Sequence, residues 1–420
     1  MRILLLDHGN ISDALAQVLT HEGHDIFATN DHYGTSRWGS TLGFLPNYSN
    51  VLDKKWDLVV SCNTYTNTCG IVEEFRARGI PTVGSGVVGF QMEEKNVGRK
   101  IFSESGFKCP KWMVFESSAD AIRYLESGEM KSVVVKFSTT NRPMRTAVFN
   151  DTNDAIRFLR DAKDGRVVLE ERVCGVEVAF SAYYDGERFV PTVTNFEHKH
   201  MFNGNMGILV PEMGTVAVYS PTPSVKELMD SLLQSKEASR YLENYRGLID
   251  VNCIVDEFGL VYALEFTCRF GVPITDIMTS LLKWSGGAYG EFLLSVANGK
   301  MDETLLVHTK EYAVGANLVV CGYGYHELFP NLCQLGSEIR GYDKLNCHHT
   351  FGDVTARDSK LFVAHPWVMC VVGNGNTIDE ARFNMLSGAE KVSFQDKVYR
   401  TDIGERVKDE LPFLQRVGLI

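Results

Sequence analysis

The sequence predicts an α/β protein built in three parts, and three observations support this prediction. Residues 1–90 alternate short apolar strands with helical stretches, which is typical of an open parallel sheet covered by helices. A second, smaller α/β set follows at 111–184, and the sequence turns strand-rich, with Gly and His turns, from Val307. We therefore expect an α/β first domain at 1–90, a two-lobed central domain at 91–305 with its small lobe at 111–184, and a C-terminal β-rich subdomain at 306–420.

The first domain is predicted to have strands at 2–6, 25–28, 57–61 and 82–84, with helices at 12–21 and 70–78. Ligands of open parallel sheets bind beyond the carboxyl ends of the strands. Those ends carry Asp7, Gly9 and Asn10 after the first strand and Asn63 after the third, so we expect these residues to bind substrate. The first loop has one glycine and no G-x-G-x-x-G pattern, which is weak evidence for a phosphate site. Asp7 would repel a phosphate and favour a neutral or cationic group, unless it only closes the strand end.

The central domain opens with a predicted helix at 93–105 that carries Lys95 and Arg99 on one face. We expect Lys95 to have only a structural role at the start of this helix. The small lobe is predicted to have strands at 132–137, 145–149, 167–171 and 177–184. Residues 186–222 are rich in Gly, Asn and Pro, and we interpret them as a long loop or lid. The later elements are predicted as a helix at 225–242, antiparallel strands at 247–255 and 260–267, and a helix at 378–392.

The last of these strands is the most informative stretch of the chain. Residues two apart in a strand point to the same face, so Glu265, Thr267 and Arg269 line one face while Phe266 and Cys268 line the other. Glu265 is suited to hold Mg²⁺, and Arg269 can bind a phosphate or a carboxylate as a fork. The alternative interpretation is a structural Glu–Arg pair on a solvated strand face. These residues alone leave both interpretations open.

Composition excludes several classes of function. The formal net charge of -11 argues against a broad nucleic-acid or anionic-membrane surface. No apolar run approaches the roughly 18 residues that span a bilayer, and the N-terminus reads as a strand rather than a signal peptide. The ten cysteines are scattered without a C-x-x-C pair, which indicates reduced thiols in a cytoplasmic protein. Cys347-His348-His349 is the one cluster suggestive of a metal, but no partner Cys pair has zinc-site spacing.

The order of motifs resembles the ATP-grasp superfamily, and most closely the phosphoribosylamine–glycine ligase family, nearly end to end. The family's E-F-N-x-R-F-G-D-P-E segment is similar to residues 265–274, its hinge strand E-E-x-x-x-G-x-E to 170–177, and its Asp-His-Lys-Arg turn to 197–200. Its M-G-A-Y-S-P resembles Met213-Gly214 followed by 217–221, and its Lys-Asp-Ile-Gly ending resembles 400–404. The resemblance implies a Rossmann-like pre-ATP-grasp domain, a two-lobed ATP-grasp domain and a β-rich C-terminal subdomain.

The resemblance also implies the nucleotide-binding residues. Adenine would lie along the hinge at Glu170, Glu171 and Val173, and Glu177 would accept hydrogen bonds from the ribose. Further implied ATP ligands are Lys136 for the α- and β-phosphates, Arg99 on the preceding helix, and Lys199. An exposed strand acid is the alternative for Glu177.

The metal site implied by the resemblance is less standard. Glu265 matches the principal Mg²⁺ ligand, whereas the family's asparagine two residues on is Thr267, a poorer oxygen ligand. Asp250 and Asn252 alternate onto one face of the neighbouring strand, and we expect Glu265 and Asn252 to hold Mg²⁺ (or Mn²⁺), with Asp250 or water completing the shell. The alternative is that Asp250 and Asn252 only pair with residues of the lid.

The substrate end departs from the family pattern. The N-terminal G-x-G-G-R-E-H-A is replaced by residues 7–14, which lack its arginine, glutamate and two glycines, and the Gly-rich phosphate flap is replaced by 138–145, which contains Arg142 and Arg145. The resemblance implies catalysis by Arg269 and Glu265, and a pocket for a small amino acid formed by Met213, Gly214, Ser220, Arg269 and Gly271.

Three functions remain open at this point. The first is an ADP-forming ligase that joins glycine or another small amino acid to an amine other than phosphoribosylamine. The second is a divergent phosphoribosylamine–glycine ligase, and the third a catalytically silent nucleotide-binding protein. All three imply ATP and small-molecule partners, no membrane partner, and a cytoplasmic monomer or homodimer.

Overall fold

The computed structural model describes residues 1–7, 11–29, 43–45, 51–64, 66–137, 146–162, 165–284, 288–309, 311–326 and 333–420, with the backbone alone at 43–45, 66 and 67. These residues group into two compact units. The larger comprises Met1–Gly106, Glu177–Asn252 and Glu265–Ile420, and the smaller comprises Phe107–Val176 and Cys253–Leu264. The three-part division of the sequence stays a prediction. The chain combines a parallel sheet with antiparallel sheets and helices, which confirms the predicted α+β class.

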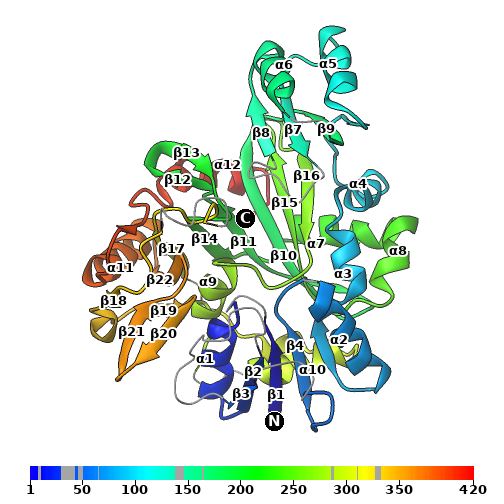
Figure 1. The fold of residues 1–420 in the computed structure, drawn as a ribbon. Helices are drawn as coiled ribbons and strands as arrows, with labels where there is room; N and C mark the ends of the chain where they lie inside the picture. Colours follow the sequence, from blue (N-terminus) through cyan, green and yellow to red (C-terminus); the bar gives the residue numbers. More distant parts are fainter. Residues whose placement is uncertain are drawn as a thin grey trace. The chain divides into compact units, whose positions relative to one another are not determined.

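The first sheet has five parallel strands in the order β3-β2-β1-β4-β5 (Figure 1). Its strands are β1 (Arg2–Leu6), β2 (Asp25–Thr29), β3 (Gly43–Leu45), β4 (Leu58–Ser61) and β5 (Thr82–Gly84), and its helices are α1 (Asp13–His21), α2 (Thr66–Ala77) and α3 (Val87–Met92). Ile3 and Leu5 pack into one apolar cluster, while Leu4 and Leu6 pack into another. Both faces of β1 are therefore covered, as in a doubly wound sheet.

The central sheet has nine strands in the order β16-β15-β10-β11-β14-β17-β22-β19, with β23 paired to β17 (Figure 1). They are β10 (Val176–Tyr184), β11 (Phe189–Glu197), β14 (Gly214–Tyr219), β15 (Gly247–Val255), β16 (Val261–Thr267), β17 (Tyr312–Val320), β19 (His348–Phe351), β22 (Trp367–Gly375) and β23 (Lys397–Val398). Residues 253–264, the hairpin end of β15 and β16, belong to the smaller unit. The C-terminal strands β17, β19 and β22 thus extend the sheet that begins in the central domain.

Two glycines allow helices to approach opposite faces of this sheet. A Cβ atom at Gly315 would lie 2.5 Å from Ile277 of α9 (Ile274–Ser280). A Cβ atom at Gly373 would lie 2.2 Å from the backbone of α11 (Ile378–Lys391) at Ala381. Gly315 pairs with Val372, so Gly373 points to the other side. Helices α9 and α11 therefore cover opposite faces.

The predicted lid at 186–222 is wrong as a description of this segment. It contains β11 and β14 of the central sheet, and a small hairpin of β12 (His200–Phe202) and β13 (Met206–Leu209). Residues 189–196 are all buried. The Gly and Asn residues that suggested a loop are concentrated in the turn at Asn203–Asn205 between β12 and β13, where Gly204 has φ 69°. The prediction was wrong because the loop-like composition of this one turn was taken to describe all of residues 186–222.

The remaining elements of the larger unit are mostly helical. The predicted helix at 225–242 is two helices, α7 (Pro223–Ser231) and α8 (Lys236–Leu242), because the Ser235 side chain caps a new helix start. Further elements are α4 (Lys95–Ser103), α10 (Tyr289–Ala297), α12 (Glu405–Arg416) and the three-stranded sheet of β18 (Glu338–Ile339), β21 (Lys360–Val363) and β20 (Val354–Arg357). The ten cysteines all lie in the described ranges, and none of them forms a disulfide. Within the described ranges, no helix has the length and apolar character to cross a membrane.

The smaller unit is a four-stranded antiparallel sheet in the order β6-β9-β7-β8. Its strands are β6 (Trp112–Phe115), β7 (Val133–Phe137), β8 (Thr146–Phe149) and β9 (Val167–Glu171), and its helices are α5 (Ser118–Glu126) and α6 (Thr152–Asp161). Val133, Val135, Val167 and Leu169 pack with both helices in one apolar cluster. Lys136 and Glu170 alternate with these residues along their strands, so their side chains point to the other face of the sheet, where they make polar contacts.

Asp276 of α9 makes the stability of the larger unit dependent on pH. Its Oδ1 atom accepts a hydrogen bond from Thr350 at 2.5 Å, and Oδ2 has no hydrogen-bond partner among the described residues. Burial, opposed by the Thr350 hydrogen bond and aided by the Asp13 carboxylate, raises the pKa of Asp276 to about 7. Between about pH 4 and this pKa the unfolded chain has lost a proton that the native state keeps, so stability falls as pH rises.

We expect Asp276→Asn to remove the part of the pH dependence of the unfolding free energy that comes from this carboxyl. Urea unfolding at about pH 5 and about pH 8 should show a smaller loss of unfolding free energy in the variant, by about 2–4 kcal/mol relative to the unsubstituted protein. Asp161→Asn, a change at an exposed site, is the matched control and should behave like the parent. An equal loss in Asp276→Asn and the parent would contradict the assignment.

Candidate functional site

One face of the central sheet carries most of the polar side chains selected from the sequence. Residues paired directly across antiparallel strands point to the same side. Asn195 of β11 lies opposite Ala179 of β10, and Glu197 lies opposite Thr215 of β14. The Asn195 amide also donates to Asp250 of β15 at 3.4 Å. We call this side the acidic face, and it comprises Glu177, Ser181, Asn195, Glu197, Thr215, Asp250, Asn252 and Glu265. We include Glu212, whose carboxyl interacts electrostatically with Glu197, Lys199 and Asp250.

Lys199 lies among three carboxylates of the acidic face. Its Nζ atom is 2.7 Å from Glu197 and 4.0 Å from both Glu177 and Glu265. Burial lowers the pKa of the Lys199 ammonium, but these three carboxylates more than offset burial and hold the pKa well above its usual range. The structure therefore brings together the predicted residues Glu177, Lys199 and Glu265, which come from three separate segments of the sequence.

Lys95 also reaches this group. Its Nζ atom lies 3.7 Å from Glu265, whereas the sequence analysis expected Lys95 only to serve the start of its helix. Arg99, one turn further along α4, is buried at 1% exposure. Glu265 thus lies between two lysines, at 3.7 Å from Lys95 and 4.0 Å from Lys199.

Asp250 and Asn252 occupy successive inward positions of β15. Asp250 Oδ1 accepts from Ser181 at 3.1 Å, and burial, aided by Glu197, raises the pKa of Asp250 to about 7. Asn252 is buried, and its Oδ1 atom has no hydrogen-bond partner among the described residues. Of the pair, Asn252 therefore offers the more available oxygen, while the Asp250 carboxyl is held within the sheet.

Glu212 is a site residue that the sequence analysis missed. It lies just before β14, is 3% exposed, and its Oε1 atom has no hydrogen-bond partner in the described part of the chain. Burial raises the pKa of Glu212 well above its ordinary value, and Glu197 raises it further while Lys199 opposes. The signal was an acid within the apolar run from Ile208 to Met213, where an unpaired carboxylate is costly.

Glu93 connects the first sheet to the end of β16. Its Oε1 atom accepts from the Cys268 amide at 2.8 Å and lies 3.6 Å from Arg269 Nε. Its Oε2 atom accepts from the Thr64 hydroxyl at 3.0 Å. Burial raises the pKa of Glu93, although Arg269 opposes this. The loop that follows β4, including buried Asn63, is thereby held beside Arg269.

Among the other predicted substrate residues, Met213, Gly214 and Ser220 are held in place by hydrogen bonds of their backbone. Met213 donates from its amide to the His198 carbonyl, Gly214 pairs with Ala316, and Ser220 donates from its amide to the Thr192 carbonyl. A Cβ atom at Gly214 would lie 2.4 Å from the Gly315 carbonyl, which explains the glycine. Gly271 follows Phe270 before α9, and a Cβ atom there would lie 2.7 Å from Ile274.

Asp7 holds its own loop. Its carboxylate accepts from the amides of Ile11 and Ser12 and from the Ser12 hydroxyl at 2.7–3.1 Å. These contacts fit the alternative that Asp7 closes the strand end, and a contact with substrate stays a prediction. Gly9, Asn10, Arg142 and Arg145 lie outside the described residues.

Comparisons with known proteins agree with this geometry. Residues 93–275 match the family model for the ATP-grasp (A) domain of phosphoribosylglycinamide synthetase. Phosphoribosylamine–glycine ligase of Neisseria meningitidis serogroup B is 27% identical over 356 residues, which cover 80% of this chain and 81% of that protein. The trifunctional purine biosynthetic protein adenosine-3 of Gallus gallus is 25% identical over 96% of this chain and 42% of its own length. The chain is an ATP-grasp ligase.

Solved structures show the same fold. Phosphoribosylamine–glycine ligase of Thermotoga maritima superposes with a TM-score of 0.77 at 23% identity and covers 96% of this chain and 100% of its own. An L-amino acid ligase of Bacillus licheniformis superposes with a TM-score of 0.60 at 13% identity, covering 95% of this chain and 98% of its own. The likeness of this ATP-grasp ligase to phosphoribosylamine–glycine ligases therefore extends over nearly the whole chain.

The residues expected to hold ATP in this ATP-grasp ligase fall in both units. Lys136 and Glu170 of the smaller unit form an ion pair at 2.5 Å, with side-chain exposures of 8% and 2%. Glu171 is exposed and donates its amide to the Lys111 carbonyl, and Val173 follows in a half-buried loop. Glu177, at 46% exposure, and Lys199 lie on the acidic face. Their contacts with nucleotide remain predictions.

The acidic face also fits the magnesium that the ATP-grasp fold implies. Mg²⁺ binds oxygen ligands and takes one or two protein groups together with substrate phosphates. Asn252 supplies a buried oxygen without a hydrogen-bond partner, and Glu265 a half-exposed carboxylate. Both are hard oxygen donors, so these two residues suit the ion.

Proposed function

We propose that this ATP-dependent ligase joins glycine or another small amino acid, through its carboxylate, to an amine that carries no phosphate. The acidic face carries this proposal. Glu177, Glu197, Glu212, Asp250 and Glu265 gather there against two lysines, Lys95 and Lys199. Magnesium and the two lysines would offset the ionised acids where ATP binds, but a further phosphate on the amine would have no counter-ion of its own. A neutral or cationic amine is therefore favoured.

The proposed reaction passes through an acyl phosphate. A carboxylate oxygen of the acid substrate attacks the γ-phosphorus of ATP, and the bond to ADP breaks. The amine then attacks the acyl carbon, so that a C–N bond forms while the C–O bond to phosphate breaks and phosphate leaves with the electron pair. Arg269 would stabilise the negative charge on the transferring phosphoryl group. Magnesium held by Glu265 and Asn252 would supply further charge neutralisation there.

The amine must lose a proton to attack. Unpartnered acceptors on the acidic face, Asn195 Oδ1 and Glu212 Oε1, suit the N–H groups of an amine. Asp250, whose pKa is raised to about 7, is the group best matched to receive the proton near neutral pH.

A divergent phosphoribosylamine–glycine ligase is the second candidate. The Neisseria meningitidis relative supports it, since that protein is a phosphoribosylamine–glycine ligase and aligns with 80% of this chain. A silent nucleotide-binding protein is the third. The presence of Glu265, Arg269, Lys136 and Glu177 argues against silence.

Phosphate release from ATP and glycine should be measured across a panel of amines that includes freshly made phosphoribosylamine. We expect ADP and phosphate as products, with fastest turnover for an amine that lacks phosphate. AMP as the stoichiometric product would reject the mechanism. Efficient turnover with phosphoribosylamine would establish the second candidate, and no turnover with any acid or amine would favour the third.

The variant Glu212→Gln tests whether the amine substrate binds next to Glu212. For a cationic amine we expect its KM to rise about tenfold or more, because the amide of glutamine, unlike the buried carboxyl, cannot ionise to pair with the bound cation. The KM for ATP should change little. Glu187→Gln, at an exposed position, is the control and should leave both values unchanged. An unchanged KM for every amine would remove Glu212 from the amine site.

A further inference from the structure

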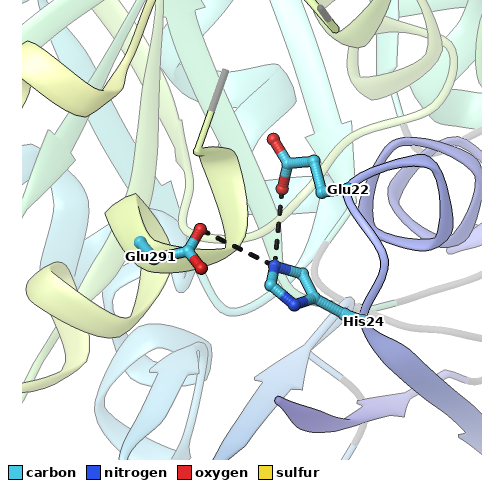
Figure 2. Close-up of side chains that lie close together, drawn as sticks. All are labelled: Glu22, His24 and Glu291. Carbon is cyan, nitrogen blue, oxygen red and sulfur yellow. Dashed lines mark ion pairs between the residues drawn. The ribbon is translucent and has the colours of Figure 1, made fainter. Parts of the chain in front are cut away.

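A second polar cluster lies away from the acidic face, where the end of α1 meets the start of α10. Glu22 follows α1, His24 precedes β2, and Glu291 lies in the first turn of α10. One ligand atom from each residue lies within 4.8 Å of the other two. Figure 2 shows the His24 ring between the two carboxylates, with Nε2 directed toward both.

The contacts of His24 Nε2 are too long for hydrogen bonds. It lies 3.6 Å from Glu22 Oε2 and 3.7 Å from Glu291 Oε2. The side chain is only 7% exposed, and Nε2 has no hydrogen-bond partner in the described residues. A buried nitrogen without a partner is costly, and here it points at two carboxylate oxygens that it does not reach.

These separations fit ligands of one metal ion. Two atoms each about 2.1 Å from a tetrahedral zinc ion stand about 3.4 Å apart, slightly less than the observed spacings. Glu291 is 49% exposed, so an ion can enter from its side and a water can take the fourth position. The other ring nitrogen, Nδ1, lies 3.3 Å from the Met1 nitrogen and points away from the two carboxylates (Figure 2).

The surrounding backbone positions the cluster. The amides of Tyr289 and Gly290 donate to the two Glu22 oxygens at 2.7 and 2.9 Å, which fixes that carboxylate and leaves each oxygen a further lone pair. A Cβ atom at Gly290 would lie 2.3 Å from His24 Nε2. Only glycine at this position lets α10 approach the imidazole so closely.

We propose that Glu22, His24 and Glu291 bind a zinc-class divalent cation, which ties the loop after α1 to the first turn of α10. The donor set of one imidazole nitrogen and two carboxylate oxygens suits Zn²⁺, whereas Mg²⁺ prefers oxygen alone. The site is separate from the ATP-grasp chemistry. Its role is structural, because the ion joins segments that are 267 residues apart in the sequence.

Zinc binding to the full chain should be measured by competition with a chromophoric chelator, and Co²⁺ by its visible absorption. We expect one equivalent of Zn²⁺ to bind tightly and raise the thermal unfolding midpoint, a tetrahedral Co²⁺ spectrum, and no shift with Mg²⁺ at the same concentration. His24→Asn and Glu291→Gln should each weaken zinc at least tenfold. Exposed His21→Gln is the matched control and should bind like the parent.

Gly290→Ala removes no ligand but should also weaken zinc, because its methyl group would displace the imidazole. Should His24→Asn fail to fold, half-exposed Glu291→Gln decides the matter. The proposal is overturned if the parent binds no zinc, or if Glu291→Gln and His24→Asn bind as the parent does. In that event the cluster is an ion pair of protonated His24 only.

Discussion

Glu265→Gln should abolish ligase turnover while leaving the fold intact. Glu265 lies 3.7 Å from Lys95 and 4.0 Å from Lys199, on the face where ATP and magnesium are expected. Glutamine keeps the shape of the side chain but removes its charge, so a metal ligand and a partner for two lysines are lost together. We expect kcat to fall by at least about 10²–10³-fold. The side chain is 36% exposed, so the loss of unfolding free energy should be only about 0–1 kcal/mol.

The measurement is ADP release under saturating substrates, with urea unfolding in parallel. Glu257→Gln, in the turn that joins β15 to β16, is the control, since it removes the same charge from an exposed site. Full activity in Glu265→Gln would mean that the metal site is wrongly assigned. Loss of activity together with loss of folding would instead make Glu265 a structural residue.

Lys136→Ala should strongly destabilise the smaller unit. Its partner Glu170 is 2% exposed and 2.5 Å away, so the substitution leaves a buried carboxylate without its cation. Breaking such a pair costs about 3–5 kcal/mol. If Lys136 also binds the α- and β-phosphates of ATP, the same change should weaken ATP binding more than binding of the amine.

A double variant separates the two roles. Lys136→Met with Glu170→Gln removes both charges at similar volume, and it should recover most of the stability without recovering ATP affinity. Lys111→Ala breaks an exposed pair with Glu129 in the same unit and should leave stability nearly unchanged. If the double variant binds ATP like the parent, Lys136 is a purely structural residue. If its acceptor affinity falls more than its ATP affinity, Lys136 lies outside the phosphate site.

Local periodicity predicted the parts of the site that lie on single strands. The half-exposed positions of Glu265, Thr267 and Arg269, against buried Phe266 and Cys268, follow from the two-residue period of a strand. The parallel first sheet was predicted from another local pattern, the alternation of apolar strands with helical stretches.

Features that depend on pairing between distant segments were not predictable. The approach of Lys95 and Lys199 to Glu265 requires the position of α4 and the register of β11, and neither is encoded in a short window. Glu212 was missed because the surrounding residues were interpreted as a lid, where a buried acid is not expected. The same error hid β11, whose inward Asn195 and Glu197 belong to the site.

The sharing of one sheet by the central and C-terminal strands limits how this chain can be divided. β14 pairs with β17 along five residues, and β17 pairs in turn with β22. A fragment that stops before residue 306 would keep β14 but lose its neighbour, exposing a row of unpaired amides and carbonyls between buried apolar side chains. Such an edge is a template for pairing with other copies. Expression of the nucleotide-binding part alone is therefore a route to aggregation, and insertions or tags are better tolerated at exposed turns such as 256–259.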